Sequence, residues 1–156
     1  MDNAHGFEEL VVWQRINELK NQIDEATADG IAGSDAALCQ DIRNAAHAAE
    51  RHMVEGFSRF NPLVFANFLE FSRTATCEVR SLLQKGVICG YFGAEQLRRL
   101  DHLAVRGLQA IVSFRRYLRS PAAKRNVTRR YPRPYTAPRK NDASVAHNFD
   151  GSHTVD

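Results

Sequence analysis

The sequence has no hydrophobic run that approaches the about 20 consecutive apolar residues of a membrane-spanning helix. It also has little cysteine, with three residues in 156. Cys39, Cys77 and Cys89 form no Cys-x-x-Cys pair, and an odd, unpaired set argues against a disulfide framework. Because no signal peptide is recognisable either, we expect a soluble cytoplasmic protein with reduced thiols and no membrane partner.

Motifs of common catalytic and metal sites are also missing. The sequence contains no His-Glu-x-x-His motif and no glycine-rich phosphate loop. His47, Glu50, His52 and Glu55 lie close together, but they do not repeat the Glu-x-x-His pair that di-iron bundles place on two helices. No nucleophile has an evident base beside it. We therefore predict a protein that is not an enzyme and that needs no metal and no cofactor.

No segment alternates polar and apolar residues for long enough to form a strand. Instead, apolar residues recur at helical spacing over four segments, at about 7–29, 34–60, 62–88 and 94–119. Ser34 is a plausible N-cap of the second helix, and Asn61 followed by Pro62 is a strong start signal for the third. The predicted core positions are Val12, Ile16, Leu19, Ile23, Ala26, Leu38, Ile42, Ala45, Ala46, Ala49, Met53, Gly56, Phe65, Phe68, Leu69, Ser72, Ala75, Val79, Leu82, Leu83, Leu97, Leu100, Ala104, Leu108, Ile111 and Leu118.

The loops between these helices are short, which makes sequential helices antiparallel neighbours. The sequence thus predicts an all-α fold, an antiparallel up-down-up-down four-helix bundle over residues 1–120. In the second helix the core line is built mostly from small residues. Alanine and glycine at these positions let a partner helix approach more closely than leucine would, so we expect a close helix-on-helix contact there.

From Pro121 onward the chain has prolines, isolated aromatic residues and no apolar period. Such a segment cannot bury enough apolar surface to offset the entropy of ordering, and we predict a disordered basic tail over residues 121–156. Three interpretations of the tail remain open. It is a solubilising extension, an arginine-rich arm that contacts RNA or DNA, or in part sequence of cloning origin.

Charge is unevenly distributed along the chain. Residues 1–33 have seven acids and two bases, residues 34–120 eight acids and twelve bases, and residues 121–156 three acids and seven bases. Arginines in the fourth helix fall close to one line opposite its leucines. This line is either an ordinary solvated face or, together with the tail, a surface for phosphate backbones. The predicted nucleic-acid contacts are Arg99, Arg106, Arg115, Arg116, Arg119, Lys124, Arg125, Arg129 and Arg130.

Several large apolar residues fall outside the core lines of the predicted helices. They either widen the core or form an outer patch that binds a partner, and the sequence leaves both interpretations open. Phe114 and Tyr117 on the fourth helix belong to this surplus. The residues predicted to form an interface between copies of the chain are Phe7, Val11, Trp13, Phe57, Phe60 and Phe71.

The segments FEELVVWQRINEL, DIRNAAHAAERHMVEGFSR and FANFLEFSRTATCEVRSLL resemble a family of four-helix-bundle proteins. Its members are encoded by intervening sequences of bacterial 23S ribosomal RNA genes, and the resemblance covers roughly residues 7–119. Where the family usually has a segment like SIPSNIAEG, this chain reads AAERHMVEG. The residues that carry the resemblance are Phe7, Leu10, Val12, Trp13, Gln14, Arg43, Ala45, Ala46, Glu55, Gly56, Arg59, Phe68, Leu69 and Glu78.

The resemblance implies a small cytosolic bundle that assembles into a ring, commonly a pentamer. It also implies similarity in fold to the accessory protein of diversity-generating retroelements, which binds nucleic acid and a reverse transcriptase. Two functional hypotheses follow. The first is a homo-oligomer that binds nucleic acid through repeated basic surfaces, and the second is a homo-oligomeric scaffold for another protein.

Overall fold

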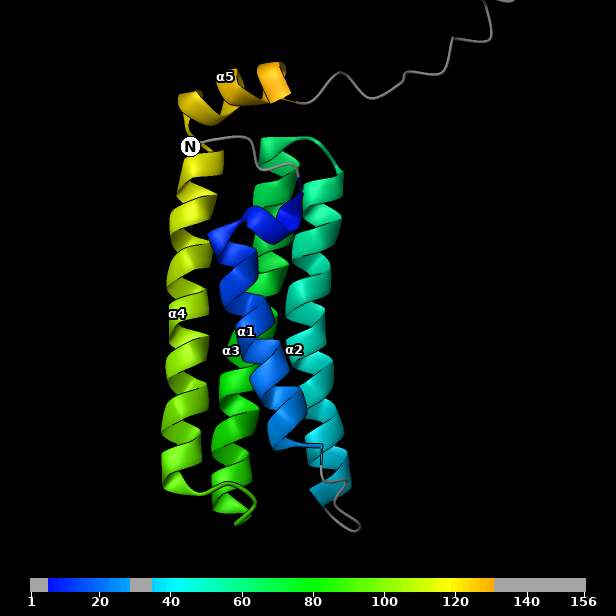
Figure 1. Cartoon of the computed structure of the whole chain (residues 1–156), viewed down its shortest axis with the longest axis vertical. Helices are drawn as coiled ribbons and strands as arrows, with labels where there is room; N and C mark the ends of the chain where they lie inside the picture. The colour runs from blue at the N-terminus through cyan, green and yellow to red at the C-terminus, as the bar shows by residue number, and fades with distance from the viewer. Residues whose placement is uncertain (1–5, 29–34, 131–156) are drawn as a thin grey trace, which may run out of the picture.

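The computed structural model of the chain describes residues 6–28 and 35–130, and the side chains of residues 6–28 and 36–125. A short 3-10 helix, η1 (Phe7–Glu9), precedes the long helices (Figure 1). The structure confirms the predicted all-α four-helix bundle. The helices that follow η1 are α1 (Val11–Ala26), α2 (Asp35–Ser58), α3 (Pro62–Ile88), α4 (Ala94–Leu118) and α5 (Pro121–Arg130).

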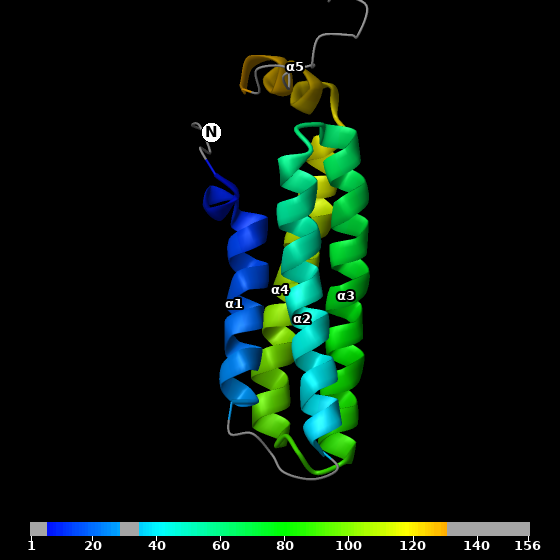
Figure 2. The same cartoon turned by 90° about the vertical axis from the view of Figure 1, so that its right-hand side faces the viewer.

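Sequential helices run antiparallel, up and down the bundle (Figures 1 and 2). Helix α1 packs against α2 and α4, and α3 packs against the same two helices from the other side. Helix α5 lies across the end of the bundle where α4 stops, and it contacts α4 and α3. We call this the α5 end, and we call the opposite end, where α1 and α3 finish, the far end.

Local capping explains the bounds of α3. The side-chain Oδ1 of Asn61 accepts hydrogen bonds from the backbone N–H groups of Leu63 (3.0 Å) and Val64 (3.2 Å), and Pro62 fills the first helical position. This is the predicted start signal. Beyond the other end of α3, Gly90 has a positive φ of 77°, which glycine adopts without strain. Ser34, the predicted cap of α2, lies outside the described residues.

The first predicted helix is divided in two. Leu10 is extended (φ −74°, ψ 124°) and separates η1 from α1. Tertiary contacts favour this break, because η1 folds back so that the Phe7 ring lies 5.4 Å from the Trp13 ring. The side chain of Gln14 also donates to the backbone oxygen of Glu8 at 3.1 Å. The helical period alone does not reveal such a break.

The predicted tail differs from the structure over its first ten residues, since 121–130 form helix α5. Pro121 suits the first helical position, and the hydroxyl of Ser120 accepts from the backbone N–H of Ala123 at 3.4 Å. Ala123 is buried against the end of the bundle, with 1% of its surface exposed. Docking of this small side chain supplies the contact that the sequence pattern did not predict. The rest of the predicted tail, residues 131–156, lies outside the described residues.

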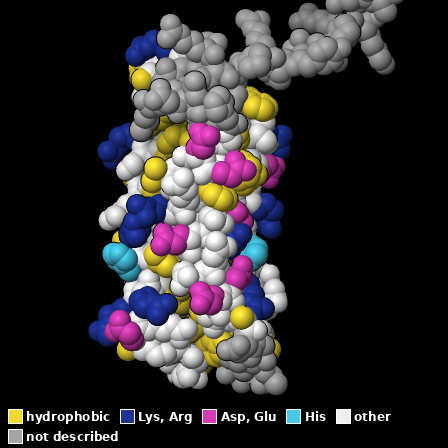
Figure 3. All heavy atoms as spheres, viewed as in Figure 1, with side chains coloured by type: hydrophobic (Ala, Val, Ile, Leu, Met, Phe, Trp, Pro, Cys, Tyr) yellow, Lys and Arg dark blue, Asp and Glu magenta, His cyan; other side chains and the backbone are white. Residues whose placement is uncertain are grey.

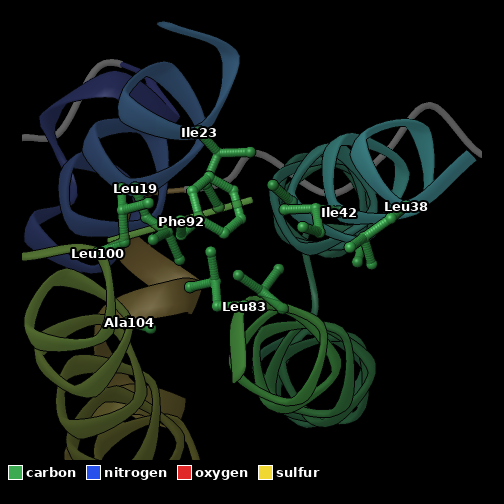
Figure 4. Close-up of a cluster of buried hydrophobic side chains, with 11 residues drawn as sticks. Leu19, Ile23, Leu38, Ile42, Leu83, Phe92, Leu100 and Ala104 are labelled. Carbon is green, nitrogen blue, oxygen red and sulfur yellow. The ribbon is translucent and has the colours of Figure 1, made fainter. Parts of the chain in front are cut away.

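Buried residues form two clusters along the bundle. Most of the predicted core positions are buried, whereas Ala26, Phe68, Leu82, Leu97 and Leu108 are only partly buried. Figure 4 shows the cluster nearer the far end, which is mostly aliphatic. The far-end core consists of Leu19, Ile23, Leu38, Ile42, Ala45, Ala46, Val79, Leu83, Phe92, Leu100 and Ala104. The α5-end core consists of Val12, Ile16, Ala49, Met53, Phe65, Ala66, Leu69, Ala75, Ile111 and Leu118.

Helices α2 and α3 make the predicted close contact at Gly56. A Cβ atom added to Gly56 would lie 2.5 Å from the Cβ of Phe68 and 2.7 Å from Cδ2 of Phe65, so only glycine fits there. Further along, the hydroxyl of Ser72 donates to the backbone oxygen of Ala49 at 2.7 Å. This hydrogen bond satisfies a buried polar group and fixes the register of the two helices.

Within residues 6–28 and 35–130, no helix is long and apolar enough to cross a membrane. All three cysteines lie in these ranges and are free thiols. Cys39 is buried, whereas Cys77 and Cys89 are exposed.

Candidate nucleic-acid and oligomer surfaces

A chain of aromatic rings crosses the α5 end of the bundle. Successive ring centroids lie 5.4 to 6.2 Å apart in the order Trp13, Phe7, Phe57, Phe65, Phe114 and Tyr117. These rings come from η1 and from each of the four long helices. Most of the contacts are edge-to-face, a favourable geometry for aromatic pairs. Phe7, Trp13 and Phe57 are partly buried here, so these members of the predicted interface also widen the core.

The other three predicted interface residues remain on the surface. Val11 is 60% exposed, Phe60 45% and Phe71 55%. The centroid of the Phe71 ring lies 5.6 Å from that of the His52 imidazole and 6.0 Å from that of the Phe68 ring. Exposure on a single chain is compatible with an interface between copies, and that role stays a prediction for all six residues.

The sequence analysis missed three further exposed apolar residues. Ile88, the last residue of α3, is 86% exposed. Leu63 on α3 is 48% exposed and Val112 on α4 is 45% exposed. For Leu63 and Val112 a signal was present in the helical period, because each lies beside a core residue, Phe65 or Ile111, but away from its line.

Helix α4 carries more arginine than its own acids can neutralise. Its two acids are both engaged, since Glu95 pairs with Arg98 one turn along the helix, and Asp101 accepts two hydrogen bonds from Arg80 of α3 at 2.6 and 3.1 Å. The remaining arginines of α4 therefore either pair with acids of other helices or have no carboxylate partner.

Three of them, Arg99, Arg106 and Arg116, lie on the outer face of α4 together with His102. Arg99, His102 and Arg116 are exposed and Arg106 is partly so. Lys and Arg side chains with a histidine line the edge of the molecule that α4 forms (Figure 3). No ion pair joins these three arginines to any residue in the described part of the chain. We call them the α4 arginines.

Arg115 does not belong to this face. Its Nη1 lies 2.6 Å from Oε2 of Glu70 on α3, and its Nε donates to the backbone oxygen of Ala66 at 3.1 Å. Arg73 also donates to Glu70, at 2.5 and 2.9 Å. The hydrogen bond from Arg73, together with the charges of Arg115, Arg73 and Arg119, lowers the pKa of Glu70 against the opposing effect of burial. Two arginines thus share one carboxylate.

The sequence held a signal for this placement. Arg115 lies four residues after Ile111 and three before Leu118, both of which are core residues. That spacing puts Arg115 at the edge of the buried line, facing α3, and not on the outer face.

The α5 end adds further cations to the surface. Arg119 follows α4 directly, and Lys124 and Arg125 lie on α5; all three are exposed. Arg129 and Arg130 belong to α5 as well, but their side chains lie outside the described set. Apart from Arg115, the predicted contacts whose side chains are described lie in two regions, the outer face of α4 and the α5 end.

Two of the four residues that the sequence grouped as metal candidates, His47 and Glu50, pair with α1. His47 Nε2 lies 2.9 Å from Oδ1 of Asp24, and Lys20 pairs with Glu50 at 3.0 Å. Among residues 6–28 and 35–130, no three His, Cys, Asp or Glu side chains gather where they could hold a metal ion. The predictions of no enzyme activity and no cofactor remain predictions.

Arg43 likewise has a structural partner. Its Nε donates to Oγ1 of Thr27 at 2.6 Å, and its Nη2 donates to the backbone oxygen of the same residue. Thr27 is the C-cap of α1. The last carbonyl groups of an α-helix have no hydrogen-bond partner within the helix. Arg43 therefore ties the end of α1 to α2 and is not free to bind a ligand.

Comparison with known proteins identifies the family of the chain. No curated protein matches the chain. The family model described as "23S rRNA-intervening sequence protein" matches residues 8–113, which run from η1 into the last turns of α4. The chain therefore belongs to the 23S rRNA-intervening sequence protein family.

Proposed function

We propose that this protein is a non-enzymatic homo-oligomer that binds nucleic acid through basic surfaces repeated around the assembly. The observation that carries the proposal is the division among the arginines. Arg80, Arg98 and Arg115 are each paired with a carboxylate, whereas the α4 arginines have no ion pair within the described residues. Unpaired cations along one helix face suit a phosphate backbone.

Self-association would multiply this surface. The support for assembly is the exposed apolar area at Val11, Phe60 and Phe71, since large exposed patches commonly mark interaction sites. We propose a closed ring, for which the family resemblance suggests a pentamer. Each copy would contribute one set of α4 arginines, and the combined affinity would exceed that of one chain.

Nucleic-acid binding is tested by fluorescence anisotropy with labelled RNA and DNA at two salt concentrations. We expect binding that weakens as salt rises, because association releases counterions from the phosphates and this release is less favourable at higher salt. Phosphate contacts carry little sequence information, so unrelated sequences should bind with similar affinity. Absence of binding at low salt, or binding that salt does not change, would refute the proposal.

A matched pair of variants locates the surface. Replacing all three α4 arginines by glutamine should weaken binding about tenfold or more and lower the salt slope by about 2. The control replaces Arg15, Arg51 and Lys85 by glutamine, which removes the same charge from other helices. Equal losses in the two variants would show that net charge, and not the α4 face, governs binding.

The oligomer is tested separately by light scattering at micromolar concentration. The expected mass is several times that of the 17.6 kDa chain. A monomer would mean that the outer apolar residues do not form an interface. An oligomer without nucleic-acid binding would favour the second hypothesis, a scaffold for another protein.

A further inference from the structure

A line of six polar side chains runs along the outer face of α4 and includes the α4 arginines. Each position follows the one before it by three or four residues, the spacing that places side chains on one face of a helix. At a rise of about 1.5 Å per residue, the line is about 26 Å long. We call it the α4 donor line, and it consists of Arg99, His102, Arg106, Gln109, Ser113 and Arg116.

Every side chain of the α4 donor line has at least one hydrogen-bond donor. Within residues 6–28 and 36–125, no hydrogen bond or ion pair engages any of these six side chains. The acids of α4, Glu95 and Asp101, pair with Arg98 and Arg80 instead. A row of donors without acceptors suits a ligand that presents acceptors and negative charge, as a phosphate backbone does.

Packing of α4 holds the donor line straight. Helix α4 runs along one edge of the bundle (Figure 1) and packs against α1 and α3. Near one end of the line, Asp101 accepts a hydrogen bond from Arg80 at 2.6 Å. Near the other end, Arg115 donates to the backbone oxygen of Ala66 at 3.1 Å. The donors are therefore fixed relative to one another, and a ligand that is equally rigid binds them at little cost in ordering.

The neighbours of α4 also limit how a nucleic acid approaches it. A single helix fits the major groove of B-form DNA, which is about 12 Å wide, but α1 and α3 cover both flanks of α4 and keep it out of such a groove. A-form RNA has instead a wide, shallow minor groove that displays 2′-hydroxyl groups. The α4 donor line can lie along this groove without entering it.

The α4 donor line lacks the feature that single-strand binding uses. Surfaces of that kind stack unpaired bases on aromatic side chains, and the line has no phenylalanine, tyrosine or tryptophan. The ring of the adjacent Tyr117 stacks on Phe114, with 5.9 Å between the centroids. A duplex has a higher charge density than a single strand and holds its phosphates at fixed spacing, so it matches a rigid row of cations better.

We propose that the α4 donor line binds double-stranded RNA along its minor groove, with the three arginines on phosphates and with Gln109 and Ser113 on 2′-hydroxyl groups. An amide and a hydroxyl each donate and accept hydrogen bonds, as a 2′-hydroxyl does. The neutral positions of the line thus suit the neutral part of the RNA backbone. This inference rests on the proposed nucleic-acid binding and names the class of ligand.

The test compares three labelled probes by fluorescence anisotropy, with the full chain at low salt. They are an RNA duplex of about 16 base pairs, the length that a double-stranded-RNA-binding domain spans, one of its strands alone, and a DNA duplex of the same sequence. We expect the RNA duplex to bind about fivefold or more tightly than its single strand, because its charge density is higher. The DNA duplex, which lacks 2′-hydroxyl groups, should bind about fivefold more weakly than the RNA duplex.

A double variant, Gln109→Ala with Ser113→Ala, removes the neutral donors and leaves the net charge unchanged. It should bind the RNA duplex about fivefold more weakly than the wild type does and change DNA-duplex affinity less than about twofold. The matched control is Ser81→Ala with Gln84→Ala, which removes the same residue types from exposed positions of α3 and should bind as the wild type does. Alanine favours the helix, and circular dichroism melting checks that both variants are folded.

Three results separate this inference from the function on which it rests. If no probe binds the wild type at low salt, both proposals are wrong. If the single strand binds as tightly as the RNA duplex, the assignment of a duplex ligand alone is overturned. If the double variant on α4 loses equal affinity for RNA and DNA duplexes, or loses no more than its control, the 2′-hydroxyl contacts are wrong and the preference for RNA with them.

Discussion

The two ends of the bundle are built from the same four helices but differ in their side chains. The far-end core is aliphatic except for Phe92, and among the described residues Ile88 is the one large hydrophobic residue exposed near it. At the α5 end a chain of six rings crosses the bundle, and five of the six are buried or partly buried. The large exposed hydrophobic residues of the described chain, other than Ile88, lie in this half: Val11, Phe60, Leu63, Phe71, Val112 and Tyr117.

This difference indicates which end of the bundle would bind a partner. The far end buries aliphatic side chains, as a bundle core requires, and exposes little hydrophobic surface. The α5 end has apolar residues both inside and outside, and the cations of α5 lie beside them. Apolar and basic surface that packing does not require is where a partner is expected to bind.

The largest expected effect comes from breaking the aromatic chain. Phe65 is 6% exposed and its ring contacts Phe57 and Phe114. Phe65→Ala should lower the free energy of unfolding by about 4 kcal/mol. Leu83→Ala, in the far-end core, should cost about 3 kcal/mol. Urea denaturation followed by circular dichroism measures both losses.

The same pair of variants distinguishes the two ends spectroscopically. Trp13 is the single tryptophan and lies in the aromatic chain, so its native-state fluorescence should change in Phe65→Ala and stay close to wild type in Leu83→Ala. Identical spectra for the two variants would contradict the division of the core into two parts.

The close contact of α2 and α3 gives the next largest effect. A Cβ at Gly56 would lie 2.5 Å from Phe68 Cβ, an atom fixed to the backbone, so Gly56→Ala should destabilise the protein by about 2 to 3 kcal/mol. At Gly107 the nearest atom is the terminal Cδ1 of Ile16 at 2.7 Å. That atom moves by rotation, and alanine favours a helix by about 1 kcal/mol.

Gly107→Ala should therefore change stability by less than about 1 kcal/mol. Thermal melts of the two alanine variants measure the contrast. A Gly56→Ala protein as stable as the wild type would show that the helices separate at little cost, and the close packing would not be a specific feature of this contact.

Backbone strain at Phe60 predicts that glycine at this position gives a more stable protein than alanine, the opposite of the order expected inside a helix. Because φ is 52° there, Phe60→Gly should be more stable than Phe60→Ala by about 1 kcal/mol. At Phe71, inside α3, the order should reverse by a similar amount, about 1 kcal/mol. Chemical denaturation of the four variants tests this, and the same order at both positions would argue against strain at Phe60.

The smallest effect concerns the ion pairs of Glu70. Its arginine partners lower its pKa below the ordinary value of 4.5, so the pairs stabilise the folded state above that pH and lose their effect as the pH falls through the lowered pKa. The side chain is 36% exposed, which limits the contribution to about 0.5 to 1 kcal/mol.

Glu70→Gln should therefore lower stability by that amount near neutral pH, and the difference from the wild type should shrink at an acidic pH below the lowered pKa of Glu70. Urea midpoints at the two pH values give the comparison. The outcome that contradicts the assignment is a difference that stays constant with pH, which would indicate a packing effect of the substitution.

The sequence by itself determined the helices, most of their bounds and the buried line of each. Helical periodicity and the Asn61 cap depend on residues within a few positions of one another, and interactions over so short a range can be predicted from the sequence. It also identified the cations and the surplus rings as the features from which function would be built.

Only the tertiary structure decided which of those cations and rings are exposed and able to contact a partner. Arg115 is neutralised by Glu70, which lies 45 residues earlier in the chain, while Arg99, Arg106 and Arg116 remain on the outer face. Helix α5 forms where Ala123 docks on the bundle, because a helix of ten residues is marginal alone. Partners and burial depend on which distant segments helix packing brings together, and the spacing of residues along one helix does not specify that.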